Sequence, residues 1–307
     1  MSDCAIEIAG VPLANPLIAA AGTVGYGPEL AEIFDPAQLG AITTKSITAE
    51  VRDGNDPWRV VDLPSGMLNA VGLANLGLDR FVEDIVPELA ELPTVIIGSI
   101  AGHTLEDYRV VAGAFDRIDA LPLVEVNVSC PNTDTGRSFG EEVKPLQELV
   151  SACRAELSNT PLIVKFSLGS GRIPELAMAA IEAGADALCV GNTFPAMAVD
   201  PETRSSRIGR AAGGFSGPGV HPIAVHRIHE LVTHLNQAGR SIPIIGLGGV
   251  ARWEDAAEFV LVGATAVGMG TTMFADPVAP RRILKGFKRW VTRHGGDLSS
   301  LRGSFKG

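Results

Sequence analysis

Eight short runs of apolar, mostly β-branched residues recur along the chain, and each is followed by a segment with helical periodicity. Strands that are apolar on both faces and separated by helices indicate a parallel sheet. With 307 residues, eight such units favour closure into a (β/α)8 TIM barrel over an open doubly wound sheet. We therefore predict one barrel domain over residues 1–307. The expected strands are residues 17–22, 41–46, 94–102, 124–129, 162–167, 187–192, 242–249 and 265–270.

Signals between these runs place the remaining elements. Thr104, followed three residues later by Asp107, is typical of a capped helix start. The stretch AIEIAGVPLANP (5–16) predicts an N-terminal hairpin that closes the bottom of the barrel. Residues 47–78 and 194–219 are long Gly/Pro-rich connections, and such long strand-end loops are usually functional or disordered. Helices are expected at residues 79–91, 104–116, 144–157, 174–183, 220–237, 252–261 and 277–292.

Composition narrows the class of protein. A net charge of −10 and only 5% aromatic residues argue against a nucleic-acid surface. No window approaches the roughly 20 apolar residues of a membrane span, and the amino terminus lacks a signal-peptide pattern, so we expect a cytoplasmic protein. The four cysteines Cys4, Cys130, Cys153 and Cys189 are widely spaced, so we predict no disulfide, zinc or iron–sulfur framework and no metal site.

Polar residues gather where the predicted strands end, which is where active sites of such barrels lie. Lys45, Asn127, Lys165 and Asn192 with Thr193 all belong to these ends. A lysine in an apolar strand is costly without a partner, so Lys165 either forms a salt bridge across the barrel or serves a ligand. The polar strand ends predict a site for a small polar molecule.

Glycines end the last two runs, at Gly248-Gly249 and at Gly270-Thr271, with Gly217 nearby. Backbone N–H groups at glycines can approach a phosphate, and the loops after strands seven and eight are the usual phosphate site of these barrels. Tight turns alone also explain paired glycines. A flavin mononucleotide (FMN), with its phosphate on the glycines and its ring near the lysines, would fit this pattern.

Cys130 lies beyond the fourth run, in the polar stretch VEVNVSCPNT (124–133), where Pro131 restricts the loop. A thiol there can act as a nucleophile or as a general base. Nucleophilic catalysis by a Cys–His pair would need a histidine on the same rim. We expect none of the six histidines to end a barrel strand, so proton transfer is the favoured role.

Seven motifs recur along the chain in a recognisable order and spacing. They are NVSCPNT (127–133), TTKSIT (43–48), GMLNAVGLANLG (66–77), NTFPAMAVDPETR (192–204), GGFSGP (213–218), IIGLGGV (244–250) and GMGTTMF (268–274). From about residue 5 to 290 the chain resembles class 1 dihydroorotate dehydrogenases. The resemblance implies an FMN-bearing barrel that oxidises (S)-dihydroorotate to orotate in pyrimidine biosynthesis.

Site residues follow from this resemblance position by position. Cys130 would remove the C5 proton of dihydroorotate while hydride passes from C6 to flavin N5, and residues 134–142 would form a mobile lid. The substrate would be held by Lys45, Asn69, Val71, Gly72, Leu73, Asn127, Asn132, Asn192 and Thr193. FMN would be bound by Ala21, Lys45, Ser46, Ser99, Asn127, Lys165, Gly191, Gly217, Gly248, Gly249, Gly270 and Thr271.

Departures from the family pattern concern the cofactor and the rim. Ala21 replaces a common serine, Ser99 replaces a common asparagine, and residues 164–171 depart from the usual Lys-Leu-Ser-Pro-Asn. These departures bear on flavin affinity. Pro195-Ala196 stands where many relatives have a glycine near the substrate, which leaves room for a different pyrimidine preference.

The loop RDGNDPWRVVDLPSGMLNAVGLANLG (52–77) resembles class 1B. That subclass implies one FMN per chain, and FAD and a 2Fe–2S cluster only on a partner subunit that passes electrons to NAD. We expect a homodimer that joins such a subunit in a heterotetramer. Three alternatives stay open: a fumarate-reducing class 1A enzyme, a dihydropyrimidine dehydrogenase-like subunit, and a flavin-free phosphate-binding barrel.

Overall fold

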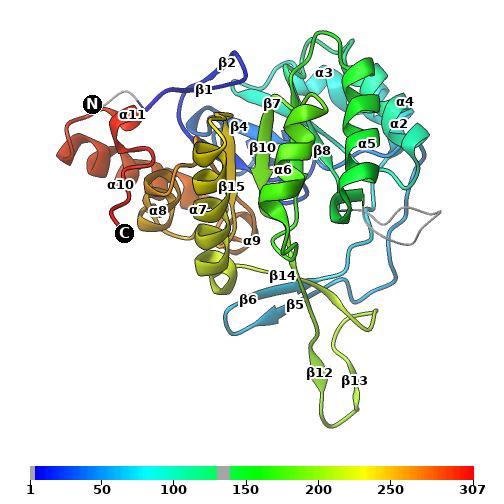
Figure 1. The fold of residues 1–307 in the computed structure, drawn as a ribbon. Coiled ribbons are helices and arrows are strands. Elements are labelled where there is room, and N and C mark those ends of the chain that lie inside the picture. Colours follow the sequence, from blue (N-terminus) through cyan, green and yellow to red (C-terminus); the bar gives the residue numbers. More distant parts are fainter. Residues whose placement is uncertain (1–3, 130–138) are drawn as a thin grey trace.

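Eight parallel strands close into a barrel in chain order, which confirms the predicted fold (Figure 1). The structure is a computed structural model that describes residues 4–129 and 139–307. Each strand pairs with the next along the chain, and the last pairs with the first. The strands are β3 (Leu17–Ala19), β4 (Ala41–Thr43), β7 (Val95–Ile100), β8 (Leu123–Asn127), β9 (Leu162–Phe166), β10 (Ala187–Val190), β15 (Ile244–Leu247) and β16 (Ala266–Met269).

Helices pack around the barrel and bury the outer faces of these strands. The predicted cap is present: Thr104 Oγ1 accepts a hydrogen bond from the Asp107 N–H, and the Asp107 carboxylate accepts from the Thr104 N–H. The main helices are α4 (Leu105–Phe115), α5 (Val143–Glu156), α6 (Ile173–Glu182), α7 (His221–Gln237), α8 (Trp253–Leu261) and α10 (Ala279–Arg293).

Shorter helical turns complete this layer. The helix expected at 79–91 is split, because one π-helical turn, η2 (Phe81–Ile85), separates two short α-helices and Pro87 stands at the start of the second. These two helices are α2 (Gly77–Arg80) and α3 (Val86–Leu89). The remaining short elements were not predicted. They are α1 (Pro28–Ala31), α9 (Thr271–Ala275), α11 (Leu298–Leu301), η1 (Pro36–Gln38), η3 (Phe139–Glu141) and η4 (Pro218–Val220).

The predicted N-terminal hairpin closes one end of the barrel. Strands β1 (Ile6–Ile8) and β2 (Val11–Leu13) pair antiparallel. Ile8 and Leu13 join the same buried cluster as Ile18, Ile97 and Ile163 of the barrel strands. Burying these side chains keeps water out of the barrel at the end that carries no site.

A small sheet extends from the opposite end of the barrel (Figure 1). The two connections expected to be irregular contribute two strands each, in the order β11-β14-β6-β5, and a further two-stranded hairpin projects from them. These segments were missed because they are short, rich in glycine and only half-buried. The strands are β5 (Val60–Leu63), β6 (Gly66–Asn69), β11 (Phe194–Ala196), β14 (Gly213–Ser216), β12 (Val199–Asp200) and β13 (Ser205–Ser206).

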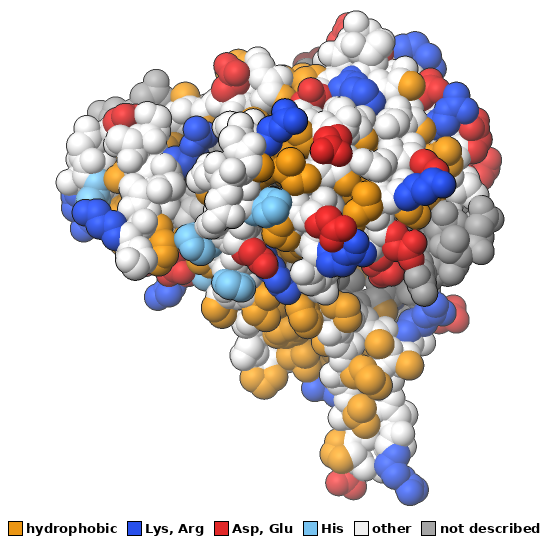
Figure 2. Space-filling view, in the orientation of Figure 1, with side chains coloured by type: hydrophobic (Ala, Val, Ile, Leu, Met, Phe, Trp, Pro, Cys, Tyr) orange, Lys and Arg blue, Asp and Glu red, His pale blue; other side chains and the backbone are white. Residues whose placement is uncertain are grey.

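The surface of this extension is more apolar than the helical layer. Figure 2 shows hydrophobic side chains gathered below the barrel and along the projecting hairpin, whereas charged side chains of both signs are scattered over the helices above. Large exposed hydrophobic residues of these connections include Trp58, Val60, Met197 and Val199. Apolar surface of this kind is typical of protein–protein contacts.

Candidate active site

A cavity of about 750 Å3 lies between the carboxyl ends of the barrel strands and the extension. Its wall combines residues that follow the barrel strands with residues of β6 and β14. Small-molecule sites usually measure roughly 300–1,000 Å3. The cavity therefore has the size and the position expected of an active site in this fold.

Most of the residues predicted from the sequence line this cavity. They converge because parallel strands in a barrel all end on the same rim. The lining residues that had been predicted are Ala21, Lys45, Ser46, Asn69, Val71, Gly72, Leu73, Asn127, Lys165, Asn192, Thr193, Gly217, Gly248, Gly249, Gly270 and Thr271.

Two predicted cofactor contacts lie outside the cavity wall. Ser99 is fully buried beneath it, and its Oγ lies 2.8 Å from the Oγ of Ser46, which does line the cavity. Gly191 packs against β15 so closely that a Cβ there would lie 1.8 Å from the Leu247 carbonyl oxygen. Ser99 and Gly191 therefore support the wall from behind and do not form part of it.

Three predictions fall wholly or partly outside the described residues. Cys130 and Asn132 lie in the segment 130–138, which the structure does not describe. Of the predicted lid 134–142, only residues 139–142 are described. In that part, the Phe139 ring packs edge-on against Tyr108, with 5.7 Å between the ring centroids.

Lys165 forms a buried ion pair and also faces the cavity. Its Nζ lies 3.2 Å from Glu125 Oε1, and the two side chains are 6% and 3% exposed. Burial lowers the pKa of Lys165, but the charge and hydrogen bond of Glu125, together with the nearby Cys189, outweigh burial and raise this pKa above its usual value. The two roles considered for this lysine are thus compatible: its charge is held by Glu125 and presented to the cavity.

Lys45, at the end of β4, faces the same cavity without a carboxylate partner among the described residues. Burial, followed by the positive charge of Arg59, lowers the pKa of Lys45. A buried ammonium group has lost favourable hydration, and an anionic ligand can replace that loss with a favourable charge–charge interaction. This electrostatic setting favours a negatively charged ligand next to Lys45.

Amide and hydroxyl groups from β8 and β10 form a connected set beside the lysines. Asn192 Nδ2 donates to Asn127 Oδ1 at 3.3 Å and to Ser129 Oγ at 3.1 Å, and Asn192 Oδ1 accepts from the Thr193 N–H. On the extension side, Asn69 Nδ2 donates to the Gly214 carbonyl at 3.1 Å. These bonds fix the direction of each amide, so the remaining donors and acceptors can read a planar polar ring.

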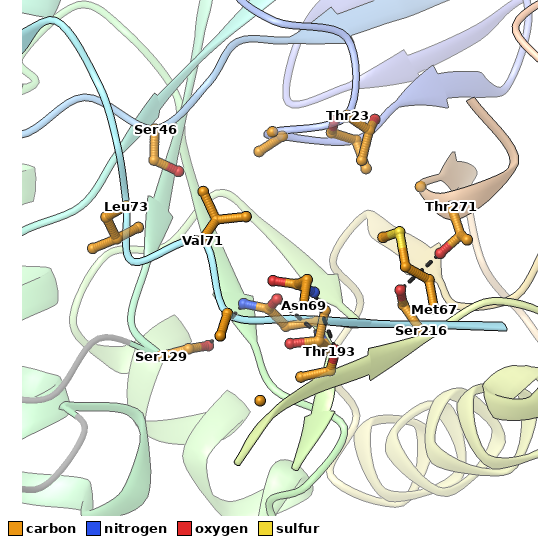
Figure 3. A pocket seen from close by; sticks show the side chains of 18 of the residues that line it. Thr23, Ser46, Met67, Asn69, Val71, Leu73, Ser129, Thr193, Ser216 and Thr271 are labelled. Carbon is orange, nitrogen blue, oxygen red and sulfur yellow. Dashed lines mark hydrogen bonds between the residues drawn. The ribbon is translucent and has the colours of Figure 1, made fainter. Parts of the chain in front are cut away.

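The far end of the cavity is built from glycines and hydroxyl groups. Figure 3 shows Ser129 and Leu73 on one side of the pocket and Ser216 and Thr271 on the other. Thr271 Oγ1 donates to Ser216 Oγ at 2.8 Å. Gly217, Gly248 and Gly249 line this end, and Gly249 adopts the left-handed φ of +69° that favours glycine. A cavity whose wall combines lysines with bare glycine backbone suits an elongated anionic cofactor.

His103 lines the cavity and was not predicted to do so. None of the six histidines ends a barrel strand, as expected, but His103 reaches the cavity wall from the loop that follows one. Strand β7 ends at Ile100, and His103 follows it three residues later, before α4, on the cavity wall. The predicted strand 94–102 ends at Gly102, so His103 follows it directly. A Cys–His pair is therefore not excluded by the position of the histidines.

Other lining residues come from the extension and from loops that carried no local signal. Arg52 and Asn55 precede β5, and Arg210 precedes β14. Their positions depend on the pairing of β6 with β14, which brings the two long connections together. The only feature of the sequence that could have pointed to these residues is the presence of arginines in long Gly/Pro-rich connections. The further lining residues that had not been predicted include Ala20, Gly22, Thr23, Met67, Ser129, Ser216, Leu247 and Phe274.

The described parts of the chain contain no helix that is long and apolar enough to cross a membrane.

Comparison with known proteins points to one family. A family model described as dihydroorotate dehydrogenase matches residues 4–291. The catalytic subunit of dihydroorotate dehydrogenase B (NAD+) from Bacteroides thetaiotaomicron is 40% identical over 296 residues, 96% of each chain. The corresponding subunit from Trichlorobacter lovleyi is 40% identical over 304 residues, 98% of each chain.

A solved structure shares the fold. The dihydroorotate dehydrogenase from Eimeria tenella, in complex with ferulenol, superposes with a TM-score of 0.80 at 21% identity. The match covers 98% of this chain and 88% of that one. At this level of identity the likeness concerns the barrel and its connections.

Proposed function

The chain belongs to the dihydroorotate dehydrogenase family, and we propose that it is a B-type catalytic subunit that oxidises (S)-dihydroorotate to orotate in pyrimidine biosynthesis. The observation that carries this proposal is that one cavity wall combines two kinds of group. Lys45, Asn127 and Asn192 suit a small anionic ring, and the glycine backbone beside Thr271 suits a phosphate. A substrate and a flavin can therefore lie against each other in one cavity.

FMN fits the residues at the glycine end. A Cβ at Gly249 would lie 2.7 Å from the Gly217 carbonyl oxygen and 2.8 Å from His221 Cβ, so only glycine lets this turn of the cavity wall pack so closely against Gly217 and His221. Gly217, Gly248, Gly249, Gly270 and Thr271 would hold the phosphate, with Ala21, Ser46 and Lys165 toward the ring. When bound, FMN supplies the acceptor for the hydride that leaves C6 of dihydroorotate. The Lys165 charge would favour an anionic reduced ring.

The substrate would occupy the lysine and amide end. Dihydroorotate carries a carboxylate, and Lys45 offers the desolvated ammonium group that suits it. Its ring carries both N–H groups and carbonyl oxygens, which the amides of Asn69, Asn127 and Asn192 can accept from and donate to. Asn132, Thr193 and the backbone of Val71, Gly72 and Leu73 would complete this end.

We assign Cys130 as the general base that removes the C5 proton. Its sequence neighbour Ser129 lines the cavity and accepts a hydrogen bond from Asn192 Nδ2. The C5 proton is acidified by the adjacent ring carbonyl, so a thiolate is a chemically adequate acceptor. The chain's own contribution to the reaction is therefore to orient the ring, to stabilise the carboxylate and to accept one proton.

The electron acceptor would be NAD, reached through a partner subunit with FAD and a 2Fe–2S cluster. The relatives in Bacteroides and Trichlorobacter carry NAD+ and the word subunit in their names. Exposed Trp58, Val60, Met197 and Val199 on the extension support a subunit contact. We propose a homodimer of this chain that binds two such partners in a heterotetramer.

The test begins with the purified chain, with and without a co-expressed partner subunit. Flavin absorbance that orotate perturbs and uracil does not would support the proposal, because only orotate carries the carboxylate for Lys45. A response to uracil alone would point to a dihydropyrimidine dehydrogenase-like activity. Protein that stays colourless in added FMN would contradict a flavoenzyme altogether. Comparing fumarate with NAD as oxidant then separates the A-type from the B-type reaction.

A further inference from the structure

His221 lies directly behind the glycine end of the cavity. It is the first residue of α7 and is only 8% exposed. Its Nδ1 lies 2.9 Å from the carbonyl oxygen of Gly248, in the turn after β15. The other ring nitrogen, Nε2, lies 3.3 Å from Glu258 Oε2 of α8, and the ring packs edge-on against Phe259 with 5.0 Å between centroids. One imidazole thus links two helices and the glycine turn.

The bond to Gly248 has only one possible direction. A carbonyl oxygen can only accept, so Nδ1 must carry a hydrogen and donate it, whether or not Nε2 is also protonated. The ring packs edge-on against Phe259, and Nε2 lies 3.3 Å from Glu258 Oε2 without forming a hydrogen bond, so packing on α8 keeps this donor in place. The carbonyl of Gly248 is therefore held toward His221.

This orientation determines where the next N–H points. In a planar trans peptide, the carbonyl of Gly248 and the N–H of Gly249 point in opposite directions. His221 is not on the cavity wall, whereas both glycines are. Among the described residues, no acceptor takes the Gly249 N–H. The Gly249 amide is therefore turned away from His221, in a residue that lines the cavity and is only partly buried.

We propose that His221 is a positioning residue for phosphate binding: through Gly248 it holds the Gly249 N–H toward the cavity, ready to donate to the phosphate of FMN. The proposal rests on the flavin binding proposed above. Without the imidazole donor, the Gly248–Gly249 peptide has no partner that fixes its rotation, since both flanking residues are glycines. His221 would thus favour binding of the phosphate without touching it.

Binding of FMN and of riboflavin, which lacks the phosphate, tests this role in the full-length apoprotein by flavin fluorescence quenching. In His221→Asn the side-chain amide nitrogen can replace Nδ1 as the donor, whereas His221→Leu keeps a similar volume with no donor. We expect the Leu variant to weaken FMN binding about tenfold to a hundredfold, the scale of one hydrogen bond to a charged group. Riboflavin binding should change less than about twofold, and the Asn variant should keep FMN affinity within about threefold of the wild type.

Matched variants keep the outcome decisive. His234→Leu replaces an exposed histidine on the same helix and should change neither affinity. If the Leu variant does not fold, His221→Ala is the alternative. It also removes the imidazole donor, and alanine is well tolerated at the start of a helix. Equal losses of FMN and riboflavin binding, or unchanged FMN binding, would overturn the positioning role while leaving the flavoenzyme proposal intact. A wild-type protein that binds neither flavin would overturn both.

Discussion

Lys165 Nζ and Glu125 Oε1 meet 3.2 Å apart inside the barrel, one strand apart and almost out of contact with water. Ser99 Oγ also donates to this carboxylate at 3.5 Å and reaches Ser46 at the cavity wall. A series of hydrogen-bonded side chains therefore connects the buried charge pair to the surface that would carry the flavin, and it runs through Glu125, Ser99 and Ser46. A disturbance of the pair should be felt both in folding and in the site.

Replacing Glu125 by Gln should destabilise the protein strongly. The substitution leaves the Lys165 charge buried without a counter-charge, which costs roughly 3–5 kcal/mol in comparable cases. The free energy of unfolding, measured by urea denaturation, checks this. Asp84→Asn, which breaks the exposed Arg80–Asp84 pair, is the control and should cost less than about 1 kcal/mol. If Glu125→Gln lowers the free energy of unfolding no more than Asp84→Asn does, water must reach the Lys165–Glu125 pair.

Replacing Lys45 by Met should stabilise the apoprotein at neutral pH and impair substrate binding. Because burial lowers the folded-state pKa of Lys45 below 10.5, the folded protein binds fewer protons than the unfolded chain between the two pKa values. Wild-type stability should therefore rise with pH in that window, and the advantage of the Met variant should shrink. Orotate affinity should fall about tenfold to a hundredfold with loss of the charge.

Unfolding curves at pH 7 and near pH 10 test the sign of this prediction. A Met variant that is less stable than the wild type at pH 7 would mean that the Lys45 ammonium group is well solvated or paired in the folded protein. Lys144→Met, at an exposed position in α5, is a matched control and should change neither stability nor orotate affinity appreciably.

Replacing Asn192 by Ala should weaken orotate binding about tenfold or more, since one side chain both lines the cavity and donates to Asn127 and Ser129. Titration of the bound flavin with orotate measures the dissociation constant. Asn236→Ala, at an exposed position near the end of α7, is the control. Unchanged orotate affinity in Asn192→Ala would place the substrate elsewhere in the cavity.

Replacing Cys130 by Ser should slow flavin reduction by dihydroorotate about 100- to 10,000-fold and change orotate binding little, because a general base acts in the transition state. Stopped-flow reduction and orotate titration separate the two effects. Cys153→Ala is the control: burial raises the pKa of Cys153 to about 12, so its thiol does not ionise near neutral pH. Equal losses of rate and of orotate affinity would instead assign Cys130 a structural role.

The barrel and much of its rim could be predicted from the sequence because the signals are local. Burial on both faces makes each strand a short apolar run, and the polar residues and glycines near the end of a run lie on the shared rim. Lys45, Asn127, Lys165 and the glycines at 248 and 249 were found in this way and line the cavity. His103 directly follows the predicted run 94–102 and was nevertheless missed, because histidines were considered only as residues that end a strand.

What the sequence by itself determined is thus the closed barrel and the polar residues that end its strands, since alternating strands and helices encode both. The tertiary structure alone decided which segments cover the cavity and which charged side chains meet inside it. The covering sheet depends on antiparallel pairing between segments as far apart as Asn69 and Gly214, which are 145 residues apart along the chain. Their strands show no regular alternation of apolar residues in the sequence. Such pairing is selected by the fit of distant segments to each other, and that information is present only once the barrel has brought them together.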